Sequence, residues 1–286
     1  MACTFASAAR SKQSGSAATR IRRAKQRRAT ADDAGIEQLP LHGKLAVVTG
    51  GGRGIGAAVA RALAQRGCRV VITYRTNADA AADTVLGLPG DGHAARQCDV
   101  TEPDAVAQLF ADLEGVDIVI NNAAIYEESK FLDASYEDWQ RVWRATIEAN
   151  LIGPANVLFH AGRAMARRGG GVVVCVGSRG AFRGEPDAPA YGASKAGLNQ
   201  LAQSAAIALA PANVVVGVVA PGFVDTAMAS GVLAGPRGAA IRGDSPFNRV
   251  ASVDEVAEAV LYFTSPHAKW SSGAIIDVNG ASYLRS

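Results

Sequence analysis

A glycine-rich stretch, TGGGRGIG at residues 49–56, separates two segments of different periodicity. Before it, KLAVVT at 44–49 is a short run of aliphatic and β-branched residues, which predicts a β-strand. After it, IGAAVARALAQRG at 55–67 has apolar residues three and four positions apart and ends on Gly67, which predicts a helix. Such a junction lets the backbone approach a pyrophosphate, and the free N–H groups of the helix attract negative charge. It therefore predicts a nucleotide site, with a plain tight turn as the alternative. The residues expected to contact the nucleotide here are Gly50, Gly52, Arg53, Gly54, Ile55 and Gly56.

The same alternation of short apolar runs and alanine-rich segments continues to the end of the chain. Near-continuous apolar strands between helices predict a parallel sheet covered on both faces, that is, a doubly wound α/β fold with ligands at the carboxyl ends of the strands. No linker or repeat interrupts residues 41–286, so one domain is expected there. Further strands are predicted at 69–73, 93–97, 116–120, 171–177, 214–219 and 274–277, and helices at about 77–86, 103–113, 136–167, 189–210 and 253–263.

Residues 1–40 differ from the rest in composition. They hold eight of the 29 Lys and Arg residues but three of the 26 Asp and Glu residues, so the rest of the chain is nearly neutral. That balance argues against nucleic acid as the main partner of the folded body. The segment is predicted to be a basic leader. It is either a transit peptide, which would place the protein in a plastid or mitochondrion, or a structureless or upstream-start extension of a cytoplasmic protein.

Several classes of protein are disfavoured by what the sequence lacks. The longest apolar runs, GVVVCVG and NVVVGVVA, are far shorter than the roughly 20 residues that a membrane-spanning helix needs. No two histidines have the spacing of metal ligands, and no metal site is expected. No pair of cysteines forms a CxxC motif, and buried free thiols are predicted rather than disulfides. The four cysteines are Cys3, Cys68, Cys98 and Cys175.

The end of the second predicted strand indicates which nucleotide is bound. An NAD site needs an acidic residue about 20 positions after the glycine loop, to hold the ribose 2′-hydroxyl. Here Tyr74 and Arg75 stand at that point. Arg75, together with Arg53, could bind a 2′-phosphate, so NADP(H) is favoured over NAD(H). The alternative is that both arginines are solvated surface charges.

Further motifs follow in a fixed order along the chain. They include YGASK at 191–195, with Ser178 thirteen residues before Tyr191. With them, residues 41 to the C-terminus resemble the short-chain dehydrogenase/reductase family in its single-domain form. Two departures are Ala124 in place of the glycine of NNAG, and Asn279-Gly280-Ala281 in place of Asp-Gly-Gly. The motifs that carry the resemblance are TGGGRGIG, CDVT at 98–101, NNAA at 121–124, the segment with Asn150, VVVCVGSRG with Ser178, YGASK and APGFVDTAM at 220–228.

The resemblance implies hydride transfer between a nicotinamide and a carbonyl carbon. Tyr191 would exchange the proton, its pKa lowered from about 10 by Lys195 one helical turn away. Ser178 would donate to the substrate oxygen, and Asn150 would hold a water that relays protons to Lys195. A Tyr–Lys pair that merely packs a helix is the alternative. Besides the loop residues, the expected cofactor contacts are Tyr74, Arg75, Asp99, Val100, Asn122, Ala123, Tyr191, Lys195, Pro221, Gly222, Val224 and Thr226.

Within the family, the C-terminal segment looks most like 3-oxoacyl-[acyl-carrier-protein] reductases, which implies a ketone carried as a thioester. Relatives that act on sugars, steroids or other small ketones and alcohols share the pattern. A nucleotide-binding sensor without catalysis is the rival from another class. A homodimer or homotetramer is expected. Segments 127–133 and 183–190 are expected to flank the substrate, and Arg237, Arg242 and Arg249 either meet an acidic carrier or are solvated.

Overall fold

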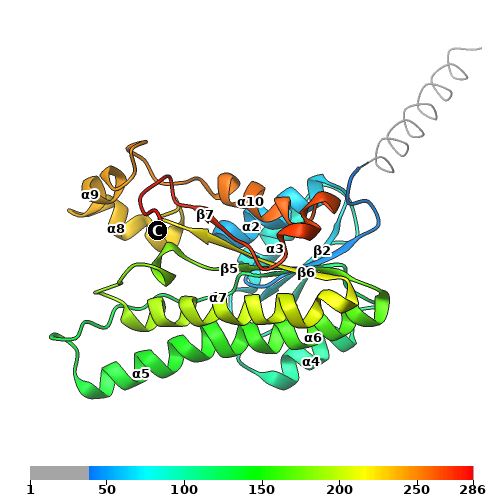
Figure 1. The fold of residues 1–286 in the computed structure, drawn as a ribbon, viewed down its shortest axis with the longest axis horizontal. Helices are drawn as coiled ribbons and strands as arrows, with labels where there is room; N and C mark the ends of the chain where they lie inside the picture. The colour runs from blue at the N-terminus through cyan, green and yellow to red at the C-terminus, as the bar shows by residue number, and fades with distance from the viewer. Residues whose placement is uncertain (1–38, 286) are drawn as a thin grey trace, which may run out of the picture.

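The computed structural model describes residues 39–285, which form seven parallel strands in the order β3-β2-β1-β4-β5-β6-β7 with helices on both faces (Figure 1). The order reverses direction between β1 and β4, as in a doubly wound sheet. The predicted fold class is thereby confirmed. The strands are β1 (Leu45–Val48), β2 (Arg69–Tyr74), β3 (Ala94–Gln97), β4 (Ile118–Asn121), β5 (Gly171–Val176), β6 (Val214–Pro221) and β7 (Ile275–Val278).

The helices divide between the two faces of the sheet, with α2, α3 and α10 on one side and α4, α5, α6 and α7 on the other (Figure 1). Two shorter helices, α8 and α9, lie at the carboxyl ends of the strands. The bounds are α2 (Gly54–Gln65), α3 (Ala78–Leu86), α4 (Pro103–Ala111), α5 (Tyr136–Ile147), α6 (Gly153–Arg168), α7 (Pro189–Leu209), α8 (Ala227–Ala234), α9 (Gly238–Gly243) and α10 (Val253–Tyr262).

The alternation of side chains along each strand produces two cores. In β1, Ala46 and Val48 pack toward α2 and α10, whereas Leu45 and Val47 pack toward α4, α6 and α7. All four are buried, as expected for a strand that is covered on both faces. Burying each of the larger aliphatic side chains stabilises the fold by about 1.5–3 kcal/mol. The two apolar layers therefore make the sheet a rigid base for the loops at its carboxyl edge.

Most predicted elements agree with the structure to within a few residues, but the helix predicted over 136–167 does not run without interruption. A π-helical segment, η1 (Glu148–Ile152), separates α5 from α6. Helices α8 and α9 were not predicted, because their sequence is rich in Gly and Ala and shows no apolar periodicity. The predicted leader at 1–40 lies almost wholly outside the described residues.

The composition raised three questions: the state of the cysteines, the presence of a metal site and the presence of a membrane-spanning helix. Cys68, Cys98 and Cys175 are buried and free, which confirms the prediction for them, while Cys3 lies outside the described residues. Across residues 39–285, no group of three or more His, Cys, Asp and Glu side chains is arranged to hold a metal ion. No helix in that range has both the length and the apolar character needed to cross a bilayer.

Candidate active site

At two positions of the glycine loop after β1, the backbone conformation or the space available favours glycine over any residue with a side chain. Gly54 has a φ of +54°, in the left-handed region that favours glycine. A Cβ atom on Gly56 would lie 2.5 Å from the carbonyl oxygen of Gly50, so a side chain there would push the turn apart. These two positions explain why the turn needs glycine, and they leave a bare backbone surface at the start of α2.

The first turn of α2 has no side-chain cap. Arg53 stands at the N-cap position in an extended conformation, and its side chain makes no capping hydrogen bond. The first N–H groups of a helix have no partner within the helix, and together with the helix dipole they attract an anion. A Cβ atom on Gly54 would lie 3.4 Å from Cγ2 of Thr226, so the loop and Thr226 face each other. The bare loop and uncapped helix fit the pyrophosphate of a dinucleotide.

Thr49 joins the loops that follow β1 and β4. Its buried Oγ1 accepts hydrogen bonds from the backbone N–H groups of Asn122 and Ala123, both at 2.9 Å. The Asn122 side chain donates in return to the carbonyl oxygen of Thr49 at 2.8 Å. The predicted cofactor residues Asn122 and Ala123 thus lie against the glycine loop. Thr49 was not among the predicted site residues, although it is the first residue of the glycine motif.

The other predicted cofactor residues on this half of the sheet also follow strands. Tyr74 ends β2 and is half-buried, while Arg75 and Arg53 are exposed. Oδ1 of Asp99 accepts hydrogen bonds from the backbone N–H and the hydroxyl of Thr101 at 3.0 and 2.8 Å, which fixes the turn after β3. Val100, next to it, is buried. The structure therefore brings these positions to one edge of the sheet.

The end of β6 and the residues that follow it carry four of the predicted cofactor contacts. Thr226 is the N-cap of α8, and its Oγ1 accepts a hydrogen bond from the N–H of Ala229. Pro221 and Val224 are buried, and Val224 belongs to the core beside α2 and α10. Gly222 is half-buried between them. Val224 thus helps to hold the segment in place through packing.

Helix α7 carries the Tyr191–Lys195 pair on its first turns. Pro189 starts the helix, where its missing N–H is no loss. Lys195 is only 3% exposed, and its Nζ donates to the carbonyl oxygen of Val176, at the end of β5, over 2.8 Å. The same Nζ lies 5.8 Å from the centre of the Tyr191 ring. The structure confirms that the two side chains share a face of the helix.

The protonation of this pair differs from the expectation. Burial lowers the pKa of Lys195 from 10.5 to about 8. The pKa of Tyr191 is raised above its ordinary value of 10, because burial outweighs the opposing hydrogen bond with Ser178. The net lowering of the Tyr191 pKa expected from the sequence is therefore not present in this structure, because desolvation by burial outweighs it. The Nζ of Lys195 is directed to Val176, and the phenol keeps its proton at neutral pH.

Ser178 lies two residues after the end of β5, at the N-cap of the short 3₁₀-helix η2 (Arg179–Ala181). Its Oγ accepts a hydrogen bond from the N–H of Gly180 at 3.0 Å, which orients the hydroxyl. The hydrogen bond between Ser178 and Tyr191 lowers the phenol's pKa. The Ser178 hydroxyl, from the loop after β5, therefore lies beside the phenol of Tyr191, from the first turn of α7.

Asn150 lies in η1, at the break between α5 and α6. It is fully buried, its Oδ1 accepts from the N–H of Ile125 at 2.8 Å and its Nδ2 donates to the carbonyl oxygen of Ile125 at 2.9 Å. Nδ2 also lies 3.3 Å from Oγ of Ser194, which in turn donates to the carbonyl oxygen of Tyr191 at 2.7 Å. Asn150 thus links the loop after β4 to the helix that holds Tyr191.

Comparison with known proteins decides the family. A family described as "Enoyl-(Acyl carrier protein) reductase" matches residues 50–281. The chain is 39% identical over 243 residues to cis-4-hydroxycyclohexanecarboxylate dehydrogenase of Sinomonas cyclohexanicum, covering 83% of this chain and 95% of that protein. It is 33% identical to 3-oxoacyl-[acyl-carrier-protein] reductase FabG of Escherichia coli, covering 85% and 98%. A solved structure described as a short-chain dehydrogenase from Burkholderia cenocepacia in complex with NADP has a TM-score of 0.76 at 32% identity, covering 85% of this chain and 98% of that one.

This chain belongs to the short-chain dehydrogenase/reductase family. It is an oxidoreductase that acts on a carbonyl or alcohol group with a nicotinamide cofactor. The sequence-based resemblance is confirmed.

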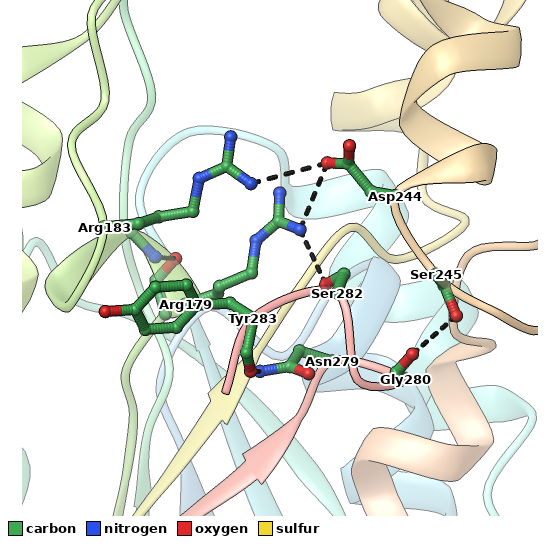
Figure 2. A network of polar contacts seen from close by, with 10 residues as sticks. Arg179, Arg183, Asp244, Ser245, Asn279, Gly280, Ser282 and Tyr283 are labelled. Carbon is green, nitrogen blue, oxygen red and sulfur yellow. Dashed lines mark hydrogen bonds and ion pairs between the residues drawn. The ribbon is translucent and has the colours of Figure 1, made fainter. Parts of the chain in front are cut away.

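This short-chain dehydrogenase/reductase has a buried arginine directly after Ser178, which sequence reasoning did not select. Nη1 of Arg179 donates to Oγ of Ser282 at 2.6 Å and to Oδ2 of Asp244 at 3.3 Å, and Arg183 reaches the same carboxylate (Figure 2). The hydroxyl of Tyr283 donates to the carbonyl oxygen of Phe182 at 3.1 Å. The loop after Ser178, the segment after α9 and the C-terminal residues are therefore one polar network. The one signal in the sequence was a charged residue next to the serine.

Helix α9 is tied to the segments that flank the site. Arg237, at its N-cap, forms ion pairs with Asp187 and, at 3.0 Å, with Glu128. Arg249 binds both carboxylate oxygens of Glu255. Arg242 donates to a carbonyl oxygen of α8. Two of the three arginines expected either to meet an acidic carrier or to be solvated thus have acidic partners within the chain, and the third bonds to the backbone.

We expect Arg237→Ala to raise KM for the substrate several-fold, with a smaller change in kcat. The substitution removes both ion pairs that hold α9 against segments 127–133 and 183–190, and exposed pairs are individually worth up to about 1 kcal/mol. Steady-state kinetics measures the effect. Arg249→Ala, which breaks an ion pair away from these segments, is the matched control. An equal rise of KM in both variants would contradict this role for Arg237.

Proposed function

We propose that this short-chain dehydrogenase/reductase is an NADP(H)-dependent enzyme that reduces ketones to secondary alcohols with Tyr191 as the proton donor. The observation that carries the proposal is the Tyr191–Lys195 pair on α7, in which the buried Lys195 Nζ lies 5.8 Å from the centre of the Tyr191 ring and bonds to the end of β5, just before Ser178. A bound nicotinamide supplies or accepts the hydride.

The side chains supply the remaining chemistry. Because its pKa lies above 10, Tyr191 holds its proton at neutral pH and can give it to a carbonyl oxygen that becomes an alkoxide. Ser178 donates a hydrogen bond to the same oxygen and stabilises the developing charge. Lys195, with a pKa of about 8, is mostly protonated at neutral pH and places a positive charge beside the phenol that becomes a phenolate. Asn150 positions Tyr191 through Ser194.

The residues that would hold the cofactor are those at the glycine loop and the neighbouring strand ends. The first turn of α2 and the glycine backbone suit the pyrophosphate, and Thr226 faces that loop. Asn122 and Ala123 lie against the same turn. Preference for NADP(H) rests on Arg75 and Arg53, which are exposed where a ribose 2′-phosphate would need cations.

We expect the double substitution Arg53→Ala and Arg75→Ala to lower kcat/KM with NADPH by about tenfold or more and to leave the value with NADH nearly unchanged. A hydrogen bond to a charged group contributes about 1.5–3 kcal/mol, and only NADPH carries the 2′-phosphate. Kinetics with the two cofactors side by side measures the ratio. Arg69→Ala, at the opposite end of β2, is the control. An unchanged ratio would refute the assignment.

For the substrate we propose a 3-oxoacyl thioester, supported by the 33% identity to the reductase of E. coli over 98% of its length. A ring-borne secondary alcohol is the second candidate. The 39% identity to cis-4-hydroxycyclohexanecarboxylate dehydrogenase favours it. The test is NADPH oxidation with acetoacetyl thioesters and simple cyclic ketones. Turnover of the thioesters supports the first candidate, and turnover of the cyclic ketones alone supports the second. Tight NADPH binding without turnover on any ketone would show a nucleotide sensor instead.

We also propose that the protein forms a homodimer or homotetramer. Large apolar side chains on the helices and near β7 are exposed, among them Phe159 at 57%, Ile207 at 80% and Trp270 at 98%. Light scattering of the full chain tests the proposal, and a monomer at micromolar concentration would contradict it. The compartment remains the prediction made from the leader, which a fluorescent fusion of residues 1–40 would test.

A further inference from the structure

The 3₁₀-helix η2, which begins right after Ser178, lies between the two proposed catalytic hydroxyls. The backbone N–H of Gly180, in the middle of η2, donates to Oγ of Ser178 at 3.0 Å. The carbonyl oxygen of the same Gly180 is 3.1 Å from the point that a Cβ atom on Gly192 would occupy, and Gly192 follows Tyr191. A movement of η2 would therefore change how the Ser178 hydroxyl is directed relative to Tyr191.

η2 is only three residues long, and short 3₁₀ segments have poor hydrogen-bond geometry, so its position depends on contacts with other parts of the chain. The first of these contacts is made by Arg179, whose side chain is buried, with 4% of the residue exposed. Its Nη1 donates to Oγ of Ser282 at 2.6 Å and to Oδ2 of Asp244 at 3.3 Å (Figure 2). Its Cζ lies 5.6 Å from the centre of the Phe223 ring.

The burial of Arg179 makes this anchor specific. Burial lowers the pKa of its guanidinium, although Asp244 opposes the shift. A guanidinium stays charged in proteins, and a buried charge that loses its partners is costly. Any position of η2 that separated Arg179 from Ser282 and Asp244 would incur that cost. The guanidinium therefore holds η2 in one place.

Two further contacts reach η2 from the same C-terminal residues. The hydroxyl of Tyr283 donates to the carbonyl oxygen of Phe182, the C-cap of η2, at 3.1 Å. The Cζ of Arg285 lies 4.4 Å from the centre of the Phe182 ring, while its Nε donates to Asp277 at 2.8 Å. Ser282, Tyr283 and Arg285 thus form a C-terminal clasp on η2. Arg179 and Ser282 are 103 positions apart in the sequence.

We propose that Arg179 is a positioning residue that acts through Ser178. By holding η2 on the C-terminal clasp, it keeps the Ser178 hydroxyl directed at the substrate oxygen on which negative charge develops. A donor of this kind is effective because it is oriented before the reaction begins. The inference rests on the proposed ketone reduction, in which Ser178 donates to that oxygen. It makes the C-terminal clasp necessary for full turnover of thioester and cyclic ketones alike.

The first test is Arg179→Met, assayed on whichever of the acetoacetyl thioesters and cyclic ketones the wild type reduces. We expect kcat to fall about tenfold, a part of the 10²–10³-fold that removal of such a donor typically costs, and KM for NADPH to change less than about twofold. Arg179→Lys keeps a cation that can donate to Ser282 or Asp244 and should recover part of the loss. Arg66→Met, which breaks an ion pair with Glu258 at the far end of α2, is the matched control and should keep kcat.

A double-mutant cycle separates positioning from a general loss of structure. If Arg179 acts through Ser178, Arg179→Met should lower kcat less than about twofold when it is combined with Ser178→Ala. A merely structural effect would lower kcat by the same factor in both backgrounds. Titration with NADPH counts the folded sites of each variant. Ser282→Ala removes one bond of the clasp and leaves Arg179 its contact with Asp244, so it provides the same cycle if Arg179→Met does not fold. Its expected effect is a loss of severalfold that also disappears with Ser178→Ala.

The possible results divide clearly. An unchanged kcat in both Arg179→Met and Ser282→Ala, or equal losses with and without the Ser178 hydroxyl, would overturn the role of Arg179. Turnover by the wild type would in that case leave the proposed function intact. Absence of turnover by the wild type with every ketone would overturn the proposed function and this inference together.

Discussion

Replacing Tyr191 by Phe is expected to lower kcat by about 10²–10⁴-fold, the usual contribution of a positioned acid or base. The substitution removes one hydroxyl and keeps the ring, so the edge-to-face contact with Tyr126 stays in place. The proton for the carbonyl oxygen then has to come from water. Ser178 still donates a hydrogen bond to that oxygen but does not supply the proton.

Stopped-flow and steady-state kinetics measure the loss, and NADPH binding should be retained, because the glycine loop and α2 are untouched. Tyr136→Phe is the matched control, since Tyr136 is 75% exposed on α5 and should leave kcat unchanged. Near-normal turnover by Tyr191→Phe would remove the basis of the proposed function.

Replacing Lys195 by Met is expected to lower kcat by about 10²-fold or more, because the variant has no positive charge to stabilise the phenolate that forms on Tyr191. The side chains have similar length, so the packing of α7 against β5 and β6 should persist. Kinetics at saturating NADPH measures the effect. Lys44→Met, at an exposed lysine paired with Asp117 on the opposite edge of the sheet, is the control. An unchanged kcat would show that the pair only packs the helix.

The same substitution has a predicted effect on stability. In the unfolded chain Lys195 titrates near its ordinary pKa of 10.5, whereas burial lowers the folded value to about 8. Between these values the unfolded state binds more protons, so the contribution of Lys195 to stability rises as the pH rises through this window. Below pH 8 the full cost of the buried ammonium is present. The difference in free energy of unfolding, Lys195→Met minus wild type, should therefore be largest at pH 7 and shrink toward pH 10. Urea unfolding at the two pH values measures it, and a difference independent of pH would contradict the assigned burial.

The parts of the site that could be predicted from the sequence are those in which local order suffices. The strand that ends in a glycine-rich turn and the helix with an i, i+4 Tyr–Lys pair each depend only on residues that are close together in the sequence. Parallel strands then bring their carboxyl ends to one edge. Ser178, Asn150 and Tyr191 were placed near one another for this reason, and the structure brings them together through Ser194 and the loop after β4.

The parts that could not be predicted depend on contacts between distant segments. The π-helical break at η1 carries Asn150, which hydrogen-bonds to the backbone of Ile125. The periodicity of the sequence does not predict such a contact. The raised pKa of Tyr191 depends on how much of the phenol is buried, which a motif does not state. From the sequence, Arg237 could have been a solvated surface charge. The structure places it at the N-cap of α9, where it forms ion pairs with Glu128 and Asp187.

The sequence by itself determined the α/β fold and the edge of the sheet at which the cofactor loop lies, because both follow from short-range periodicity and spacing. Its motifs indicated the Ser–Tyr–Lys chemistry through their resemblance to the family. Only the tertiary structure decided which groups surround that chemistry. Folding placed Asn150 against Ile125 and Ser194, and it joined Arg179 to Asp244 and Ser282 (Figure 2). The reason is physical. Burial and long-range pairing set the charge state and the hydrogen-bonding needs of a side chain, and both depend on residues far away along the chain.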